Sequence, residues 1–411
     1  MADLVSVEDL LDRILGTIAP LHHYQQPLME CVGLPVCEDV VASIPLPSFD
    51  NSGMDGYAVC HADVAAASAD APVHLPVVGE IGAGQARLLA MSPGTAVKIM
   101  TGAPVPAGCD AVVPYEWTDR GVAQVVINRA PNPGQHIRRA GEDVEPGDVL
   151  LEEGTLLGPR QLGLLAAVGR DRVAARPRPR VVVISTGSEL REPGSSLSHD
   201  SVYDANSYLL AAAARRAGAI VYRVGIVPDD AAAFRDALSD QLVRADLVVT
   251  SGGVSEGDYD VVKESLRELG TMWFGGVAMQ PGKPQGFGTV GEDQTPIFTL
   301  PGNPVSSYIS FQVFVLPAIR KMMGMTPHSR PLTRGVLTHA LSSPPGKRQF
   351  LRASYDVSGS KVNTPVTPVG GPGSHLIGDL AAANALIVVP EDVTSLMAGA
   401  EVQILRLDDE F

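Results

Sequence analysis

The sequence predicts a multidomain α/β protein that is built around a doubly wound parallel sheet. From about residue 177 to residue 327, short apolar runs alternate with stretches long enough to be helices. This is the pattern of βαβ units that cover both faces of a parallel sheet. Outside this region, short β-like runs lie among turn residues, and the 411-residue chain holds 42 glycines and 33 prolines. Such stretches are typical of small β domains.

Two segments in the first half of the chain are expected to be helices. Apolar side chains recur at helical spacing in residues 6–18, where Ser6 and Asp9 form a capping-box pattern. Residues 160–169 show a similar helical pattern. We expect the two helices to form one small region, which an insertion rich in Gly, Pro and short β-like runs interrupts.

The central domain is expected to begin after a linker of alternating Pro and Arg at 175–180. The predicted strands are 181–185, 220–227, 246–250 and 297–300. The predicted helices are 204–218, 231–244, 259–269 and 304–322. Their connections should be right-handed crossovers. β-like runs return after about residue 327, which predicts a small C-terminal β domain.

A polar loop follows each of the four predicted strands. In an open parallel sheet, ligands bind beyond the carboxyl ends of the strands, so we expect these loops to meet at one edge. Gly252 and Gly253 allow the backbone to approach a ligand closely, and a helix N-terminus after them would favour phosphate. Asn303 followed by Pro304 predicts the start of another helix at the same edge.

The same loops carry carboxylates that would repel a phosphate unless a cation lies between them. These carboxylates belong to Glu189, Asp229, Asp258 and Asp260. Carboxylate and phosphate oxygens are ligands that Mg²⁺ prefers, and Lys283 could add a positive charge. Each loop alone is also explained by an ordinary turn, and Asp229–Asp230 by a helix N-cap. The residues therefore leave two alternatives, a phosphoester site with a divalent cation and a set of plain turns.

Composition excludes several other classes of protein. The formal net charge of −15 argues against a nucleic-acid surface. The four cysteines form no CxxC pair and no HExxH motif occurs, so a structural zinc site is not expected. We find no signal-peptide pattern and no apolar run near the ~20 residues that span a bilayer, so no membrane association and a cytoplasmic location are expected.

Eight short motifs follow one another along nearly the whole chain. They are SGMDGYAV (52–59), TGAPVPAGCDAVVP (101–114), IRRAGEDV (137–144), STGSEL (185–190), YDANSYLL (203–210), SGGVSEGDYD (251–260), PGKP (281–284) and LPGNPVS (300–306). In this order they resemble the motifs of the molybdopterin molybdenumtransferases, the MoeA family of molybdenum cofactor biosynthesis. The C-terminal domain of gephyrin shares the fold of this family.

The resemblance implies four parts. They are an elongated linker domain, a β-rich insertion domain, an α/β domain of the molybdopterin-binding type and a small C-terminal β domain. The boundaries that we expect for them are 1–45 with 144–176, then 46–143, 177–327 and 328–411. The resemblance also implies a homodimer, in which the α/β domain of one subunit and the β insertion of the other share the active site.

The implied activity is that of a transferase which inserts molybdate into adenylylated molybdopterin, with Mg²⁺-dependent release of AMP. Matched to the family's motifs, the catalytic carboxylates are Asp55, Asp143, Glu189, Asp229 and Asp260. The expected magnesium ligands are Glu189, Asp229, Asp258 and Asp260. The residues expected to bind the cofactor substrate are Thr101, Ser251, Gly252, Gly253, Ser255, Lys283, Pro301, Asn303 and Ser306. A molybdopterin adenylyltransferase and proteins that mature molybdoenzymes are the further partners that the resemblance suggests.

The chain departs from the family's pattern at two positions, because Gly276 and Gln280 stand where the family often has lysine. A site for molybdate, a dianion, would lose two positive charges there. Lys283, Arg138 and Arg139 are the candidates to compensate for this loss.

Two other functions remain open from the sequence. One is the adenylyltransferase that acts one step earlier, although that enzyme is usually a single short domain with a GGTG turn, where this chain has GGVS. The other is a non-catalytic scaffold of the gephyrin type, which would keep the fold and lose the chemistry. The complete set of carboxylates argues against the scaffold, and the two missing lysines argue weakly for it.

Overall fold

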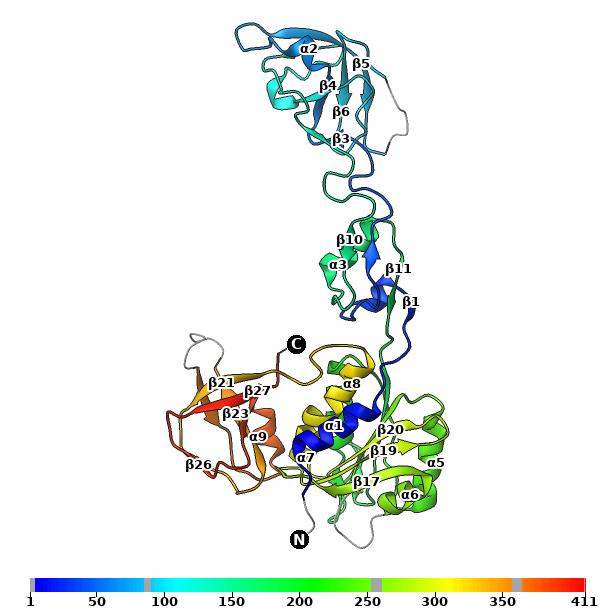
Figure 1. The fold of residues 1–411 in the computed structure, drawn as a ribbon, viewed down its shortest axis with the longest axis vertical. Helices are drawn as coiled ribbons and strands as arrows, with labels where there is room; N and C mark the ends of the chain where they lie inside the picture. The colour runs from blue at the N-terminus through cyan, green and yellow to red at the C-terminus, as the bar shows by residue number, and fades with distance from the viewer. Residues whose placement is uncertain (1–3, 85–89, 253–260, 357–363, 410) are drawn as a thin grey trace. The chain divides into compact units, whose positions relative to one another are not determined.

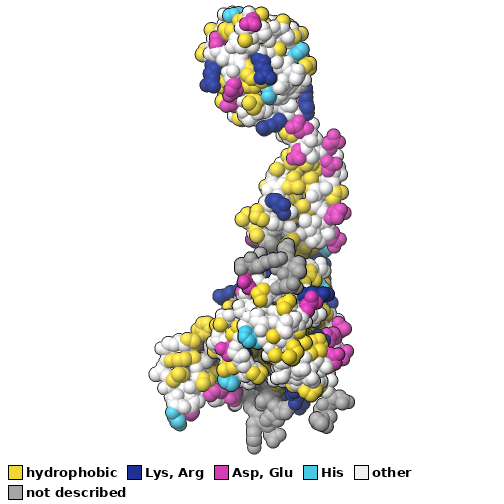
Figure 2. Space-filling model, turned by 90° about the vertical axis from the view of Figure 1, so that its left-hand side faces the viewer, with side chains coloured by type: hydrophobic (Ala, Val, Ile, Leu, Met, Phe, Trp, Pro, Cys, Tyr) yellow, Lys and Arg dark blue, Asp and Glu magenta, His cyan; other side chains and the backbone are white. Residues whose placement is uncertain are grey.

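The structure is a computed structural model that describes residues 4–84, 90–252, 261–356, 364–409 and 411 (Figure 1). The chain divides into two compact units, one of residues 1–24 with 175–411 and one of residues 25–174. Among the described residues, no helix has both the length and the apolar character needed to cross a membrane. On the face shown in Figure 2, the Lys and Arg side chains are scattered among acidic ones. They form no continuous basic surface on that face.

The unit of residues 25–174 contains a five-stranded sheet in the order β7-β4-β6-β5-β8. Its strands are β4 (Gly56–Val59), β5 (Val73–Ile81), β6 (Ala96–Ile99), β7 (Ala111–Pro114) and β8 (Gln124–Ile127). Only β5 and β6 are parallel. Tyr57, Val113 and Val125 are fully buried in its core, which fits the predicted β-rich insertion.

The remaining, shorter elements of this unit lie before, between and after the strands of that sheet in the sequence. They are β1 (Tyr24–Pro27), η1 (Leu28–Cys31), β2 (Val40–Val41), β3 (Asn51–Ser52), α2 (His61–Val64), η2 (Tyr115–Trp117), β9 (Ile137–Arg138), β10 (Val149–Leu151), α3 (Pro159–Ala167) and β11 (Arg172–Ala175). The pairs β1–β11 and β2–β10 join segments before the predicted insertion of residues 46–143 to segments after it, and β3–β9 joins the two ends of the insertion itself.

The second unit is organised around a six-stranded sheet in the order β15-β12-β16-β20-β19-β17. Its strands are β12 (Arg180–Ser185), β15 (Ile220–Arg223), β16 (Leu247–Ser251), β17 (Gly270–Gly276), β19 (Pro284–Val290) and β20 (Thr295–Leu300). The first four strands in spatial order are parallel, as the sequence predicts, and β12 and β16 are completely buried apart from Arg180.

Strands β17 and β19 are antiparallel additions to this sheet that the sequence analysis does not predict. Both are rich in glycine, which normally weakens a strand. Here the aromatic side chains of β17 occupy the space above these glycines, because a Cβ at Gly286 would lie 2.7 Å from Phe274 Cε1. The purely parallel sheet of the prediction is therefore a mixed sheet with a parallel core.

The helices of this domain follow the predicted order. They are α4 (Asn206–Arg216), α5 (Ala231–Leu242), α6 (Val261–Leu269), α7 (Pro304–Ser310), the π-helix η3 (Phe311–Val315) and α8 (Leu316–Met322). Helices α5 and α6 cover one face of the sheet, where Phe234 and Leu266 pack with Val182, Val248 and Ile297. Two-residue strands β13 (Leu190–Arg191) and β14 (Val202–Tyr203) pair in the loop that precedes α4.

Helix α1 (Val7–Thr17) begins as predicted, since Asp9 N–H donates to Ser6 Oγ at 3.0 Å. Its location differs from the expectation that it groups with residues 160–169. The Lys321 Nζ of α8 donates to the Leu15 carbonyl, and the apolar face of α1 is buried within the unit of the central sheet. Helical periodicity predicts an apolar face but not the surface that covers it, so α1 and α3 lie in different units.

The C-terminal part forms a second six-stranded sheet in the order β18-β23-β24-β21-β27-β25. Its strands are β18 (Met279–Gln280), β21 (Leu332–Leu337), β23 (Arg348–Tyr355), β24 (Pro365–Pro368), β25 (Ala385–Val389) and β27 (Glu401–Arg406). Strand β25 also pairs with β23, so five of these strands close into a barrel around Ile387 and Ile404. The remaining elements are β22 (Leu341–Ser342), α9 (Ile377–Ala381) and β26 (Ser395–Leu396).

Candidate functional site

The ends of three neighbouring parallel strands lie side by side at one edge of the central sheet. Ser251 at the end of β16 is in register with Ser185 of β12 and with Leu300 of β20. The chain continues this alignment beyond the strands, because Thr186 N–H donates to the Ser251 carbonyl at 3.3 Å. Loops from distant parts of the sequence therefore share this edge, where ligands bind in open α/β sheets.

Gly252 brings two of these loops into close approach. Its φ of +93° lies in the left-handed region that favours glycine. A Cβ at this position would lie 3.1 Å from both the carbonyl oxygen and Oγ1 of Thr186. The glycine thus allows the two loops to pack closely, and Thr186 occupies the space that a Cβ would take. The predicted residues Gly253 and Ser255 lie outside the described residues.

Glu189 and Asp229 meet at the same two-residue turn. The carboxylate of Glu189 lies over Gly187, where a Cβ would be 2.7 Å from Glu189 Oε2. Asp229 comes from the loop before α5, and its Oδ2 accepts a hydrogen bond from Ser188 N–H at 3.1 Å. Both carboxylates are therefore held against residues 187–188 at the end of β12.

Asp230 takes the structural role that Asp229 could have had. It is the N-cap of α5, and its Oδ1 accepts from Ala233 N–H at 2.8 Å. Asp229 is consequently not engaged as a helix cap. Within the residues that the structure describes, no three His, Cys, Asp or Glu side chains gather as a metal site. The other predicted ligands, Asp258 and Asp260, lie outside those residues.

The start of α7 contributes less to this edge than the sequence indicates. Asn303 is the N-cap and Pro304 the first helical residue, as predicted, but the Asn303 side chain makes no capping hydrogen bond. Val305 N–H, in the first turn, donates to the Ser374 carbonyl at 3.1 Å, so this amide is not available to a phosphate. Pro301 and Ser306 are both buried.

The antiparallel strand β19 brings Lys283 to the edge where β20 ends. Because Gly286 pairs with Thr299, the start of β19 lies beside the end of β20. A Cβ at Gly276 would lie 3.3 Å from Lys283 Cε, so the lysine stem covers a position where the family often has lysine. Gln280, the other such position, lines a cavity of about 690 Å³ together with residues of the C-terminal barrel.

In the unit of residues 25–174, Asp55 and Thr101 form one cluster. Asp55 Oδ1 accepts from both the backbone N–H and the hydroxyl of Thr101, each at 2.7 Å. These two hydrogen bonds, the backbone one first, hold the pKa of Asp55 below its ordinary value. The structure thus brings together a predicted catalytic carboxylate and a predicted binding residue, and Asp55 is ionised at neutral pH.

The turn that carries Asp143 is anchored by a second acidic residue. Asp50 accepts from Ala140 N–H at 2.8 Å and pairs with Arg139 at 2.6 Å, and both contacts lower the pKa of Asp50. Asp143 N–H donates to the Leu46 carbonyl at 3.0 Å, which leaves its exposed carboxylate to solvent. Arg139 is therefore engaged within its own loop, whereas Arg138 is exposed beside it.

Comparison with known proteins accounts for almost the whole chain. Profiles of the MoeA N-terminal region (domain I and II), the probable molybdopterin binding domain and the MoeA C-terminal region (domain IV) match residues 5–169, 182–321 and 334–407. Molybdopterin molybdenumtransferase 2 of Mycobacterium tuberculosis is 48% identical over 93% of this chain and 94% of its own. The chain belongs to the molybdopterin molybdenumtransferase family. The corresponding enzyme of Haemophilus influenzae is 36% identical over 92% of both chains.

A solved structure supports the same assignment to the molybdopterin molybdenumtransferase family. The crystal structure of the molybdopterin biosynthesis MoeA protein from Pyrococcus horikoshii is 31% identical, has a TM-score of 0.81, and covers 99% of this chain and 100% of its own. The multidomain α/β fold expected from the sequence is thus confirmed.

The largest omission of the sequence analysis lies in the family motif YDANSYLL. It contains a buried carboxylate, Asp204, and an amide, Asn206, that contact the ends of the parallel strands. The signal was present, since an Asp and an Asn that directly precede or begin a helix often hydrogen-bond to backbone. Their partners, far away in the sequence, could be found only from the fold.

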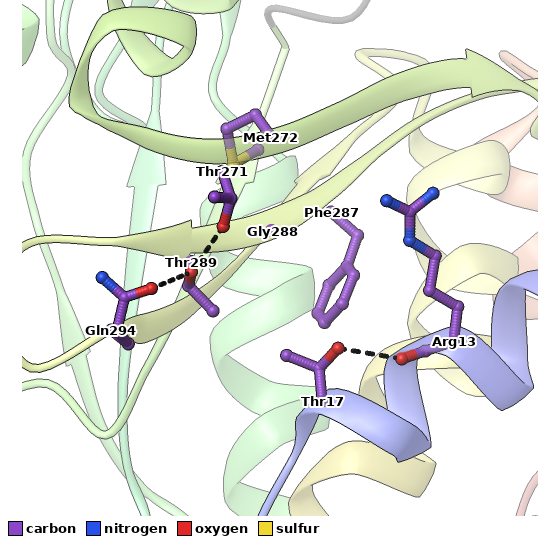
Figure 3. A pocket seen from close by; sticks show the side chains of 8 residues that line it. All are labelled: Arg13, Thr17, Thr271, Met272, Phe287, Gly288, Thr289 and Gln294. Atoms are coloured by element: carbon purple, nitrogen blue, oxygen red, sulfur yellow. Dashed lines mark hydrogen bonds between the residues drawn. The ribbon is translucent and has the colours of Figure 1, made fainter.

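A cavity of about 490 Å³ between α1 and strands β17 and β19 is separate from the candidate site of this family member (Figure 3). Thr271 pairs with Thr289 at the ends of their strands opposite to Gly276 and Pro284. The hydroxyls of these threonines lie 2.8 Å apart, and Thr289 Oγ1 also donates to Gln294 Oε1 at 2.8 Å. The side chains of Thr271, Thr289 and Gln294 thus hydrogen-bond to one another, and we assign no ligand to this cavity.

Proposed function

We propose that this chain inserts molybdate into adenylylated molybdopterin and releases AMP in a Mg²⁺-dependent reaction. The proposal is supported by the family and by the names of relatives that match over most of the chain. The observation that carries it is the convergence of Glu189 and Asp229 on residues 187–188, next to the close backbone approach at Gly252. An adenylyltransferase is usually a single short domain, and a scaffold does not need the full set of carboxylates.

The proposed reaction balances without an oxidant or a reductant. Water cleaves the phosphoanhydride, so that AMP leaves with one phosphate and the other stays on the pterin side chain. Molybdate exchanges one oxygen for the two dithiolene sulfurs, and this oxygen leaves as water with the two thiol protons. The sulfur ligands belong to the substrate, so the protein needs no cysteine at this site.

The donor set at the strand ends fits a magnesium ion. Glu189 and Asp229 would hold it, with Asp258 and Asp260 as the further ligands of the proposal. Two carboxylates are enough for Mg²⁺, which usually completes its shell with water and substrate phosphate. When bound, the ion would neutralise charge on the phosphates.

The protein's own groups would bind and orient the substrates. Ser251 and Gly252 would present backbone and hydroxyl groups to the phosphates, and Lys283 would add positive charge near the same edge. Asp55 and Asp143, from the β insertion of a second copy, would complete the site in a homodimer. A cytoplasmic location is part of the same proposal, as are contacts with an adenylyltransferase and with proteins that mature molybdoenzymes.

A direct assay tests this function. Purified protein is mixed with adenylylated molybdopterin and Mg²⁺, with and without molybdate, and AMP is measured by chromatography. We expect release of AMP that depends on molybdate, and we expect D260N to abolish it while light scattering still shows a dimer. Binding of the adenylylated pterin without AMP release under any oxyanion would reject the enzyme in favour of a binding protein.

A further inference from the structure

The side-chain amide of Asn206 links two strand ends at the candidate site. Its Nδ2 donates to Ser251 Oγ at 2.6 Å and to the Gly302 carbonyl at 2.6 Å. A carbonyl oxygen can only accept, so the amide nitrogen must be the atom that faces Gly302. Ser251 is the last residue of β16, and Gly302 lies in the turn between β20 and α7. One side chain therefore fixes the distance between these two loops.

Asp204, two residues earlier, ties the same segment to a third strand. It is only 1% exposed. Its Oδ1 accepts from Ser185 Oγ at 3.1 Å, at the end of β12, and from Ser207 N–H at 3.0 Å. Its Oδ2 accepts from Ser207 Oγ at 2.6 Å. Residues 204–207 thus form a brace across the ends of β12, β16 and β20, which are neighbours in the sheet.

Among the described residues, the Asn206 amide makes only part of the hydrogen bonds that it could form. Its Oδ1 is buried and accepts no hydrogen bond from the residues that the structure describes. A buried acceptor without a donor destabilises the folded state, which offsets part of what the two Nδ2 hydrogen bonds contribute. Such a group points to a role in geometry rather than in stability.

We propose that Asn206 is a positioning residue for the transfer reaction, and this inference rests on the proposed function. By holding Ser251 and Gly302 at a fixed separation, it keeps residues 251–252 after β16 and the turn before α7 in one geometry. A misplacement of about 1 Å at a catalytic site can lower the rate about 100-fold. The brace is the device that prevents this here.

The substitution N206D tests the proposal, because it keeps the shape of the side chain and removes the donor at neutral pH. We expect kcat to fall about 100-fold at pH 7.5. N206A also removes the donor and should lower kcat at least as much, and in both variants KM for the adenylylated pterin should change less than kcat. Activity of N206D or N206A within twofold of wild type at pH 7.5 overturns the proposal.

N384D is the matched control. Asn384 Nδ2 also donates to a carbonyl, that of Tyr355 at 3.0 Å, but in the C-terminal barrel. We expect N384D to change thermal stability without the loss of kcat. A comparable loss of kcat in both variants would show that N206D acts by general destabilisation and would overturn the positioning role.

Hydrogen–deuterium exchange separates this inference from the proposed function. In N206D, exchange should rise at residues 251–252 and 302–303 and stay unchanged in the barrel. If wild type releases no AMP, the proposed function fails, yet exchange still decides whether Asn206 braces the loops. Unchanged exchange at both loops rejects the brace whatever the activity.

Discussion

Replacing Gly252 with alanine tests whether the two strand-end loops approach each other as closely as the structure shows. Gly252 has a φ of +93°, and a Cβ there would lie 3.1 Å from two oxygens of Thr186. Gly399 provides the matched control, since its φ is +86° and a Cβ there would meet nothing within 4 Å. Both substitutions strain the backbone, but only G252A also overpacks a neighbour.

The magnitude follows from these two terms. Left-handed backbone at a residue with a Cβ costs about 1–2 kcal/mol, so G399A should lower the free energy of unfolding by that amount. The contact with Thr186 adds about 1–3 kcal/mol, because the Thr186 backbone is held by its hydrogen bond to Ser251 and cannot move freely. Thr186 lies two residues before Ser188, whose N–H donates to Asp229, so we expect a shift of Thr186 in G252A to lower activity as well.

Urea unfolding measures this difference. In a W117F background, Trp273 is the one tryptophan that remains, and it lies in the same compact unit as both glycines. We expect G252A to cost about 1–3 kcal/mol more than G399A. Equal costs for the two variants, to within about 0.5 kcal/mol, would show that the loops are not in contact.

Three further outcomes are expected in the unit of residues 25–174. Because the pKa of Asp55 is lowered in the folded protein, its carboxylate stabilises the fold at pH values above the ordinary pKa of 3.8, and this stability is lost as the pH falls through the folded pKa. In thermal melts between pH 6 and 2.5, T101V should show a smaller loss of stability than wild type. An unchanged profile would contradict the assigned hydrogen bond. Burial raises the pKa of Cys109 to about 11, so only about one thiol in a thousand is ionised at pH 8, and mass spectrometry should find iodoacetamide labelling of Cys109 much slower in native than in unfolded protein. Y57F removes the 2.8 Å hydrogen bond to the Gly121 carbonyl and should cost about 1 kcal/mol; no change in the unfolding midpoint would count against that bond.

The sequence predicts the parallel core of the central domain because its strands are continuous apolar runs. Strands β12 and β16 have few polar residues to suggest another structure, and both are buried. Strands β17 and β19 escape prediction because their glycines imitate a loop. Only the fold shows that Phe274 fills the space above Gly286. Helix α1 shows the second limit, since a helical pattern does not name its partner.

The candidate site was predictable where backbone geometry alone decides it. The edge at which the polar loops meet follows from parallel strands, and Gly252 follows from its position after β16. Which of two adjacent aspartates caps a helix does not follow, because both fit an N-cap. The structure assigns the cap to Asp230 and leaves Asp229 for Ser188. Asn206 was missed for a different reason, because its two partners lie 45 and 96 residues further along the chain.

The most direct test of the central claim is calorimetric binding of AMP with and without Mg²⁺ to wild type, D229N and D230N. Asn caps helices about as well as Asp, so D230N controls for a change of charge one residue away. If Asp229 and Glu189 hold the ion that carries the phosphate, wild type and D230N will bind AMP only with Mg²⁺, and D229N will bind it at least tenfold more weakly. Equal binding without Mg²⁺, or equal weakening in D229N and D230N, would contradict this account.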